Sequence, residues 1–137
     1  MTIGGNNVYE NVEIDYRMSS LKAKDILAIL NGEKSESLPT VIESTENDNL
    51  FVFWSGHGVP GAMCWDEEPY AMTGDDLSTV FKDMNLKRRY RKLLMMVEAC
   101  FSGGVMEQCE GIPGMLFITA ANGDETSKAD VFNGEMK

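Results

Sequence analysis

The chain has 137 residues, a length typical of a single domain with its own hydrophobic core. Its 12 Lys and Arg stand against 22 Asp and Glu, and this net charge of -10 argues against a nucleic-acid partner. No apolar run approaches the roughly 20 residues that span a bilayer, and residues 1–7 lack the pattern of a signal peptide. Three cysteines at irregular spacing, with no Cys-x-x-Cys pair, indicate neither a disulfide framework nor a zinc site.

The first third of the chain predicts one strand-like segment and one helix. Alternating apolar residues near the start indicate an edge strand or hairpin within residues 1–18: Val8, Val12, Ile14 and Tyr16. Ser19-Ser20 is expected to cap a short helix over 21–30, which Asn31-Gly32 ends. Residues 33–49 then form a polar connection.

Three continuous apolar runs predict strands that are covered on both faces. They lie at 50–54, 93–97 and 115–119. After the first run, 62–65 and 70–72 flank a polar turn and predict a hairpin.

Helices and turns separate these strands. Thr73 with Asp76 forms a variant capping box, and it opens a helix whose apolar residues recur from Leu77 to Met84. The basic run 87–92 predicts a solvated turn that also complements the dipole of this helix, and a short helix is expected around 105–109. Strand, helix, strand, short helix and strand together predict a parallel α/β sheet with right-handed crossovers.

A histidine and a cysteine follow two of the predicted strands. His57 lies just past 50–54 and Cys100 just past 93–97. Parallel strands present their carboxyl ends at one edge, and neighbouring strands are about 4.8 Å apart, so the two side chains are expected to meet there. An imidazole beside a thiol favours the thiolate and later protonates a leaving amine. Flanking glycines permit close backbone approach, and the amides of Gly58 and Cys100 are candidate oxyanion donors.

Each residue also has a structural interpretation. A single cysteine after a buried strand is typically a core residue, and a lone histidine is typically structural. The joint position of His57 and Cys100 at strand ends favours the catalytic interpretation, whereas Cys64 and Cys109 are expected to be ordinary. A metallohydrolase is the weakest alternative, because one histidine and no spaced ligand set disfavour zinc.

The two motifs resemble a known family. The sequence resembles the caspase-like clan of cysteine peptidases at Ser55-Gly56-His57-Gly58 and at Glu98-Ala99-Cys100-Phe101-Ser102-Gly103. Within this clan it is most similar to the legumain family. That family includes asparaginyl endopeptidases and the catalytic subunit of the glycosylphosphatidylinositol transamidase. The likeness covers most of the chain and is strongest over about residues 50–127. It implies a caspase-like, mostly parallel sheet with flanking helices. Residues 1–137 would form one peptidase core that lacks the family's first strand and C-terminal part.

The resemblance also assigns site residues. His57 and Cys100 match the catalytic dyad, and Gly58 with Cys100 match the oxyanion amides. Glu98 and Ser127 match positions that line a pocket for an asparagine side chain, and Asn133 falls where the family has an acidic residue. No metal or cofactor is implied.

These motifs lead to one expected activity and two alternatives. The leading hypothesis is an endopeptidase that forms a thioester acyl-enzyme and acts on a peptide or protein substrate. A transamidase would pass the acyl group to an amine instead of water, and an inactive caspase-like interaction module would keep only the fold. The missing strand predicts a complementing segment of the same enzyme or self-association. The resemblance implies a secreted, periplasmic or endomembrane location.

Overall fold

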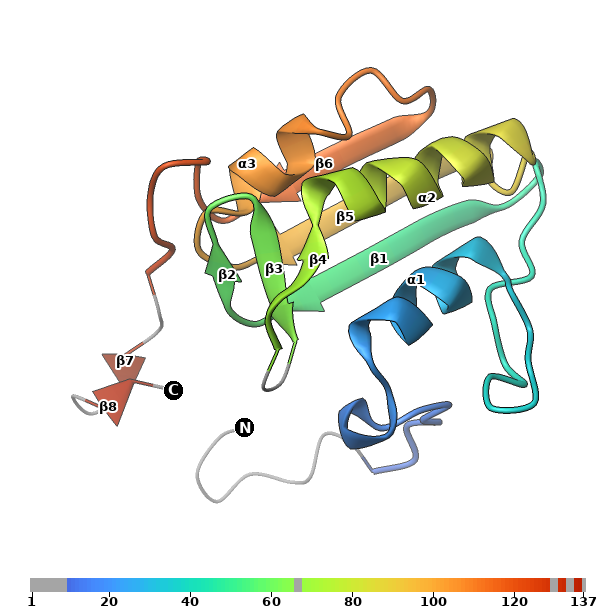
Figure 1. Cartoon of the computed structure of the whole chain (residues 1–137), viewed down its shortest axis with the longest axis horizontal. Helices are drawn as coiled ribbons and strands as arrows, with labels where there is room; N and C mark the ends of the chain where they lie inside the picture. Colours follow the sequence, from blue (N-terminus) through green and yellow to red (C-terminus); the bar gives the residue numbers. More distant parts are fainter. Residues whose placement is uncertain (1–9, 66–67, 129–130, 133–134, 137) are drawn as a thin grey trace.

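A parallel three-stranded sheet forms the centre of the computed structural model, which describes residues 10–65, 68–128, 131–132 and 135–136. The sheet order is β1 (Asn49–Ser55), β5 (Lys92–Glu98) and β6 (Met115–Thr119) (Figure 1). Phe51 pairs with Leu94, and Leu94 pairs with Leu116, so the three strands are in continuous register. All three predicted strands and their parallel arrangement are therefore confirmed.

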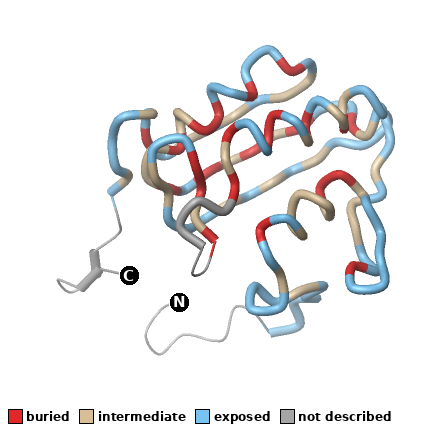
Figure 2. Tube along the Cα trace, viewed as in Figure 1, coloured by how far each residue is buried: buried red, intermediate tan, exposed pale blue. Residues whose placement is uncertain are grey.

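Three helices cover one face of this sheet. They are α1 (Ala23–Asn31), α2 (Gly74–Leu86) and α3 (Ser102–Glu107), and α2 runs along β5 and β1 in Figure 1. The helices bury alternate residues of the strands against their own apolar faces. This core includes Val52, Trp54, Leu77, Phe81, Met84, Leu93, Met95, Val97, Val105 and Phe117. Figure 2 shows the buried positions concentrated on the helices, on β3 and on β5.

The opposite face of the sheet is not covered by any described segment. Four of the large side chains that alternation places there are exposed: Phe51 is 62% exposed, Phe53 55%, Leu116 62% and Ile118 48%. The prediction that these strands are covered on both faces is wrong for the described part of the chain. Apolarity on both faces shows what a strand is able to bury, but not which segment buries it.

A small antiparallel sheet follows β1. It contains β2 (Gly58–Val59), β3 (Ala62–Trp65) and β4 (Glu68–Thr73) in that order. The predicted hairpin is confirmed, whereas the two-residue strand β2 was not expected. A separate two-stranded sheet pairs β7 (Val131–Phe132) with β8 (Glu135–Met136).

Helix ends agree with the sequence at two positions. Thr73 caps α2, since its hydroxyl accepts from the Asp76 N–H at 3.2 Å and the Asp76 carboxylate accepts from the Thr73 N–H at 3.0 Å. Gly32 ends α1 with φ of +71°, the left-handed conformation that glycine adopts readily.

The beginning of α1 differs from the prediction. Ser19-Ser20 does not cap it but lies in a 3-10 helix, Met18–Ser20. Lys22 is the N-cap, and the Asp25 carboxylate accepts from its N–H at 2.8 Å. Residues 12–17 form no strand, contrary to the expected edge strand or hairpin, and Val8 lies outside the described residues.

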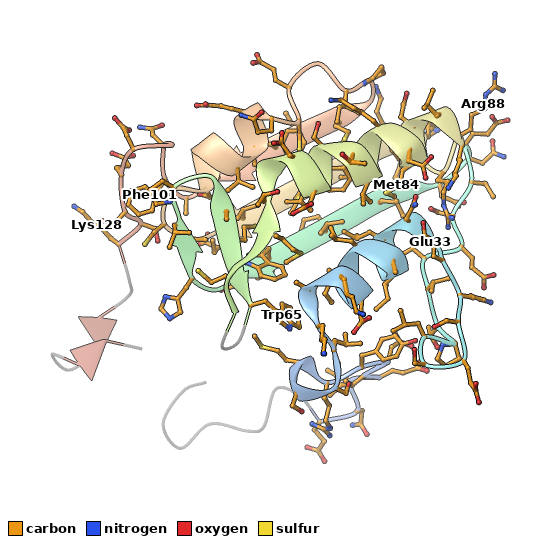
Figure 3. All side chains as sticks on the ribbon, viewed as in Figure 1. Glu33, Trp65, Met84, Arg88, Phe101 and Lys128 are labelled. Atoms are coloured by element: carbon orange, nitrogen blue, oxygen red, sulfur yellow. The ribbon has the colours of Figure 1, made fainter. Side chains whose placement is uncertain are left out.

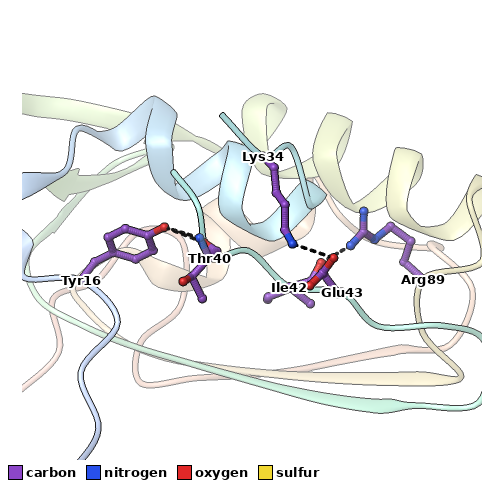
Figure 4. Close-up of polar contacts among 6 residues, drawn as sticks. All are labelled: Tyr16, Lys34, Thr40, Ile42, Glu43 and Arg89. Carbon is purple, nitrogen blue, oxygen red and sulfur yellow. Dashed lines mark hydrogen bonds and ion pairs between the residues drawn. The ribbon is translucent and has the colours of Figure 1, made fainter. Parts of the chain in front are cut away.

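Long-range polar contacts hold the N-terminal segment and the polar connection. The Tyr16 hydroxyl donates to the Thr40 carbonyl and accepts from its N–H, both at 2.8 Å (Figure 4). Lys34 and Glu43 form an ion pair at 2.9 Å, and both side chains are exposed to solvent (Figure 4). Among the described residues, every helix is too short or too polar to cross a membrane.

Candidate active site

The carboxyl ends of β1 and β5 bring the two motif loops together. Ser55 pairs with Glu98 at the last position of these parallel strands, and the Gly56 N–H donates to the Glu98 carbonyl at 3.1 Å. His57 and Cys100 each lie two residues past the end of their strand. They therefore leave the sheet side by side at the same edge.

Gly58 brings the histidine loop against the cysteine loop. A Cβ atom built on Gly58 would overlap the Cys100 carbonyl oxygen and lie 3.3 Å from the Ala99 side chain. The His57 carbonyl accepts from the Cys64 N–H at 2.9 Å, and this bond holds the turn between β2 and β3. Only glycine permits this approach, and it brings the backbone of the residue after His57 into contact with Cys100.

The Cys100 sulfur is half-buried and faces the loop after β6. Its Sγ atom lies 3.6 Å from the Ser127 Oγ atom. The next residue, Phe101, has φ of +56°, and its N–H donates to the Glu125 carbonyl at 2.9 Å. A left-handed conformation is uncommon for a residue other than glycine, so the turn at the cysteine is held by its surroundings.

The His57 side chain is exposed at this edge. The structure records no hydrogen bond between its imidazole and Cys100 among the described residues. Catalytic hydrogen bonds of ligand-free enzymes are often long and shorten when substrate binds. The arrangement places the two groups on adjacent loops, with the imidazole on the solvent side.

The residues expected around the substrate occupy different places. Glu98 is exposed, and alternation along β5 puts it on the uncovered face of the sheet, on the side opposite Val97. Ser127 is half-buried against the cysteine sulfur. Asn133 lies outside the described residues. The structure therefore brings Ser127 to Cys100, while Glu98 lies at the strand end on the other face.

A cavity of about 290 Å³ adjoins the histidine. It is lined by Met18, Phe53, Trp54, Ser55, Gly56, His57, Cys64 and Trp65. The two tryptophan rings pack with centroids 5.4 Å apart, and the buried Trp54 indole N–H has no recorded partner among the described residues. Neither Glu98 nor Ser127 lines this cavity. Sequence reasoning missed it, because it depends on the approach of β3 and the N-terminal segment to β1.

The other two cysteines have different surroundings. Burial raises the pKa of the Cys109 thiol to about 11, an effect that the charge of Lys82 only partly offsets. Cys64 is half-buried in β3. Among the described residues, no cluster of three or more His, Cys, Asp or Glu side chains is arranged to hold a metal ion.

A sequence model of the peptidase C13 family matches residues 2–137. The chain belongs to the peptidase C13 family. Its curated relatives include a hemoglobinase of Schistosoma mansoni, 37% identical over 123 residues, which cover 87% of this chain and 27% of the relative. A vacuolar-processing enzyme of Ricinus communis is 33% identical over 90% of this chain and 25% of the relative, and a legumain of Rattus norvegicus is 29% identical over 96% and 31%.

Membership of the C13 family agrees with the fold. The parallel sheet with its helices corresponds to part of a caspase-like fold, and the legumain-like resemblance inferred from the motifs is confirmed. The chain spans between a quarter and a third of the length of these relatives.

Proposed function

We propose that this chain carries the catalytic core of a cysteine endopeptidase, with Cys100 as nucleophile and His57 as general acid and base. The main support for the proposal is that both residues follow neighbouring parallel strands at the same edge of the sheet, where Gly58 lies against the Cys100 carbonyl. C13 membership supports the reaction class, since relatives are named legumain and vacuolar-processing enzyme.

The reaction follows from these groups. His57 takes the proton of the Cys100 thiol, and the thiolate attacks the carbonyl carbon of the scissile peptide bond. The backbone amides of Gly58 and Cys100 are the proposed donors to the oxyanion that develops. His57 then gives the proton to the leaving amine, and a thioester forms on Cys100. Water, deprotonated by His57, hydrolyses the thioester and restores the thiol.

The dyad is tested by removing each cysteine of the chain in turn. In the full-length enzyme, Cys100→Ala is expected to abolish peptide hydrolysis with little effect on folding, because a half-buried residue at a strand end contributes little packing. Cys64→Ala and Cys109→Ala serve as controls and should retain activity. Retention of more than a few per cent of the hydrolysis rate by Cys100→Ala would show that another residue attacks.

The proposed specificity is for a small polar residue, asparagine first, before the cleaved bond. Ser127 lies beside Cys100 and supports this assignment. Glu98 ends β5 on the uncovered face of the sheet and is assigned to the pocket from the resemblance, because a carboxylate can accept from a side-chain amide. Asn133 is assigned to the same pocket from the resemblance alone. Profiling the full-length enzyme on a peptide library tests this assignment: cleavage mainly after Arg, Lys or large apolar residues would refute it and leave the dyad intact.

We also propose that residues 1–137 form one core that a further segment completes. The uncovered sheet face exposes Phe51, Phe53, Leu116 and Ile118, a contiguous apolar surface of a kind that soluble proteins usually cover. A complementing segment of the same enzyme, or a second copy, is the expected cover. Parallel sheets are normally covered on both faces, and this is the physical reason for the expectation.

A further inference from the structure

The hydroxyl of Ser127 contacts the atom that is proposed to attack. Ser127 Oγ lies 3.6 Å from Cys100 Sγ, and it is the one side-chain hydrogen-bond partner that the structure records for this sulfur among the described residues. Both residues are half-buried, so the contact is partly shielded from water. Either atom is able to donate while the sulfur is a thiol. Once it is a thiolate, only the hydroxyl has a proton to donate.

The loop that carries Ser127 is tied to the turn of the nucleophile at several points. The Phe101 N–H donates to the Glu125 carbonyl at 2.9 Å, and the Glu125 carboxylate accepts from the Asn122 N–H at 3.1 Å. The buried Ser102 hydroxyl contacts both the carbonyl and the N–H of Ala121 at 3.3 Å. Phe101 and Lys128 lie at the same end of the molecule in Figure 3. These bonds join the loop on the N-terminal side of Ser127 to the turn that carries the sulfur.

We propose that Ser127 is a positioning residue, whose hydroxyl donates to the Cys100 thiolate and holds the sulfur in place for attack. This inference rests on the proposed function for the identity of the nucleophile. When the thiol is activated, its proton passes to the His57 imidazole. The Ser127 O–H bond stays intact, and the hydroxyl donates a hydrogen bond to the negatively charged sulfur. A donor to the charged form favours that form.

The role differs from substrate binding in one measurable way. Iodoacetamide is too small to occupy a side-chain pocket, so a residue that binds only substrate does not affect its reaction with Cys100. Removing the hydroxyl takes one charge-assisted hydrogen bond from the attacking sulfur, and the greater nucleophilicity of a less stabilised thiolate offsets part of this loss. The expected net effect at neutral pH is alkylation that is about threefold slower.

The test compares two variants of the same shape in the full-length enzyme. Ser127→Thr keeps the hydroxyl, and Ser127→Val replaces it by a methyl group. Alkylation of the Cys100 peptide is followed by mass spectrometry, with Ser127→Ala as a second deletion and Thr126→Ala as a control at the exposed neighbour. We expect the substitutions Ser127→Val and Ser127→Ala to slow alkylation of Cys100 about threefold. The Ser127→Thr and Thr126→Ala variants should react at the wild-type rate.

Equal alkylation rates for Ser127→Thr and Ser127→Val would overturn the inference, whether or not peptides are cleaved. The proposed function would be refuted if the enzyme cleaved no peptide. The role of Ser127 would still hold in that case if Ser127→Val were alkylated more slowly than Ser127→Thr. Unfolding would accelerate alkylation, so a slower rate does not arise from it. Thermal melting of each variant shows that the compared proteins are folded.

Discussion

At the scale of single residues, Gly58 makes the strongest geometric demand on the site. In Gly58→Ala the new methyl would overlap the backbone carbonyl of Cys100, which a side-chain rotation cannot relieve. We expect a loss of about 1–3 kcal/mol in the free energy of unfolding and a large loss of hydrolysis, because the two loops must separate. Gly56→Ala is the matched control, since its methyl meets its nearest neighbour, the Trp54 Nε1 atom, at an ordinary 3.5 Å. Equal effects of the two variants on activity would contradict this account.

Burial makes the Cys109 thiol unreactive. Because burial raises its pKa from 9.0 to about 11, the folded protein holds this proton more tightly than the unfolded chain does. The resulting stabilisation is fully present below about pH 9 and is lost as the pH rises toward 11. We expect iodoacetamide at neutral pH to modify Cys100 and leave Cys109 unmodified.

Urea unfolding offers a second check on Cys109. The difference in unfolding free energy between wild type and Cys109→Ala should shrink as the pH rises from 9 toward 11. A constant difference over this range, or rapid neutral alkylation of Cys109, would show that the thiol is not shielded.

The sequence predicted where His57 and Cys100 lie because strand ends are easy to locate. Apolar runs bounded by glycine placed His57 and Cys100 at one edge of a parallel sheet, and the strand pairing agrees. The contact of Ser127 with the sulfur has no local signal, since it depends on hydrogen bonds between the loop after β6 and the turn at Phe101. The cavity beside His57 has no local signal either, since it depends on the approach of β3 and the N-terminal segment to β1.

At the scale of elements, Arg89 joins three segments that are distant in sequence. Its guanidinium donates to the Asn31 carbonyl at the end of α1, at 2.7 Å, and to the Ile42 carbonyl (Figure 4). The basic run was predicted as a solvated turn, which fits the exposed Arg88 but not the half-buried Arg89. Charge alone does not reveal which of two adjacent arginines faces inward.

This difference predicts unequal effects of two neighbouring substitutions. Arg89→Ala leaves the carbonyls of Asn31 and Ile42 without their donor, so we expect a loss of about 2 kcal/mol of unfolding free energy. Arg88→Ala removes only an exposed ion pair with Glu46 at 3.3 Å and should cost less than about 0.5 kcal/mol. Urea unfolding of both variants measures the difference, and similar losses would show that Arg89 does not hold α1.

Element boundaries show what local pattern does and does not determine. The strand predicted at 115–119 is observed over those residues, because a five-residue apolar run bounded by turns has few alternatives. The start of α1 was misplaced, since the cap is supplied by Lys22 and Asp25 and a serine pair nearby had the stronger propensity. The third helix was expected around 105–109 and begins earlier, at Ser102, directly after the turn at Phe101.

At the scale of the whole molecule, the uncovered sheet face predicts association. We expect the isolated chain to self-associate through this face, because four large apolar side chains are exposed on it. Phe53→Ser with Leu116→Ser should shift the chain toward monomer in sedimentation velocity. Leu86→Ser is the control, since Leu86 is 82% exposed but lies on α2. An isolated chain that is monomeric without any substitution would refute the association, and an equal effect of the control would refute the role of this face.

Labelling by a peptidyl electrophile tests whether Cys100 attacks with the help of His57. The full-length enzyme is treated with an asparaginyl peptide that carries a thiol-reactive group, and the modified residue is mapped by mass spectrometry. We predict a single modification at Cys100 that is slowed about a hundredfold in His57→Ala, in the range expected for loss of a general base. Modification at another residue, or modification of Cys100 at an unchanged rate in His57→Ala, would contradict the account.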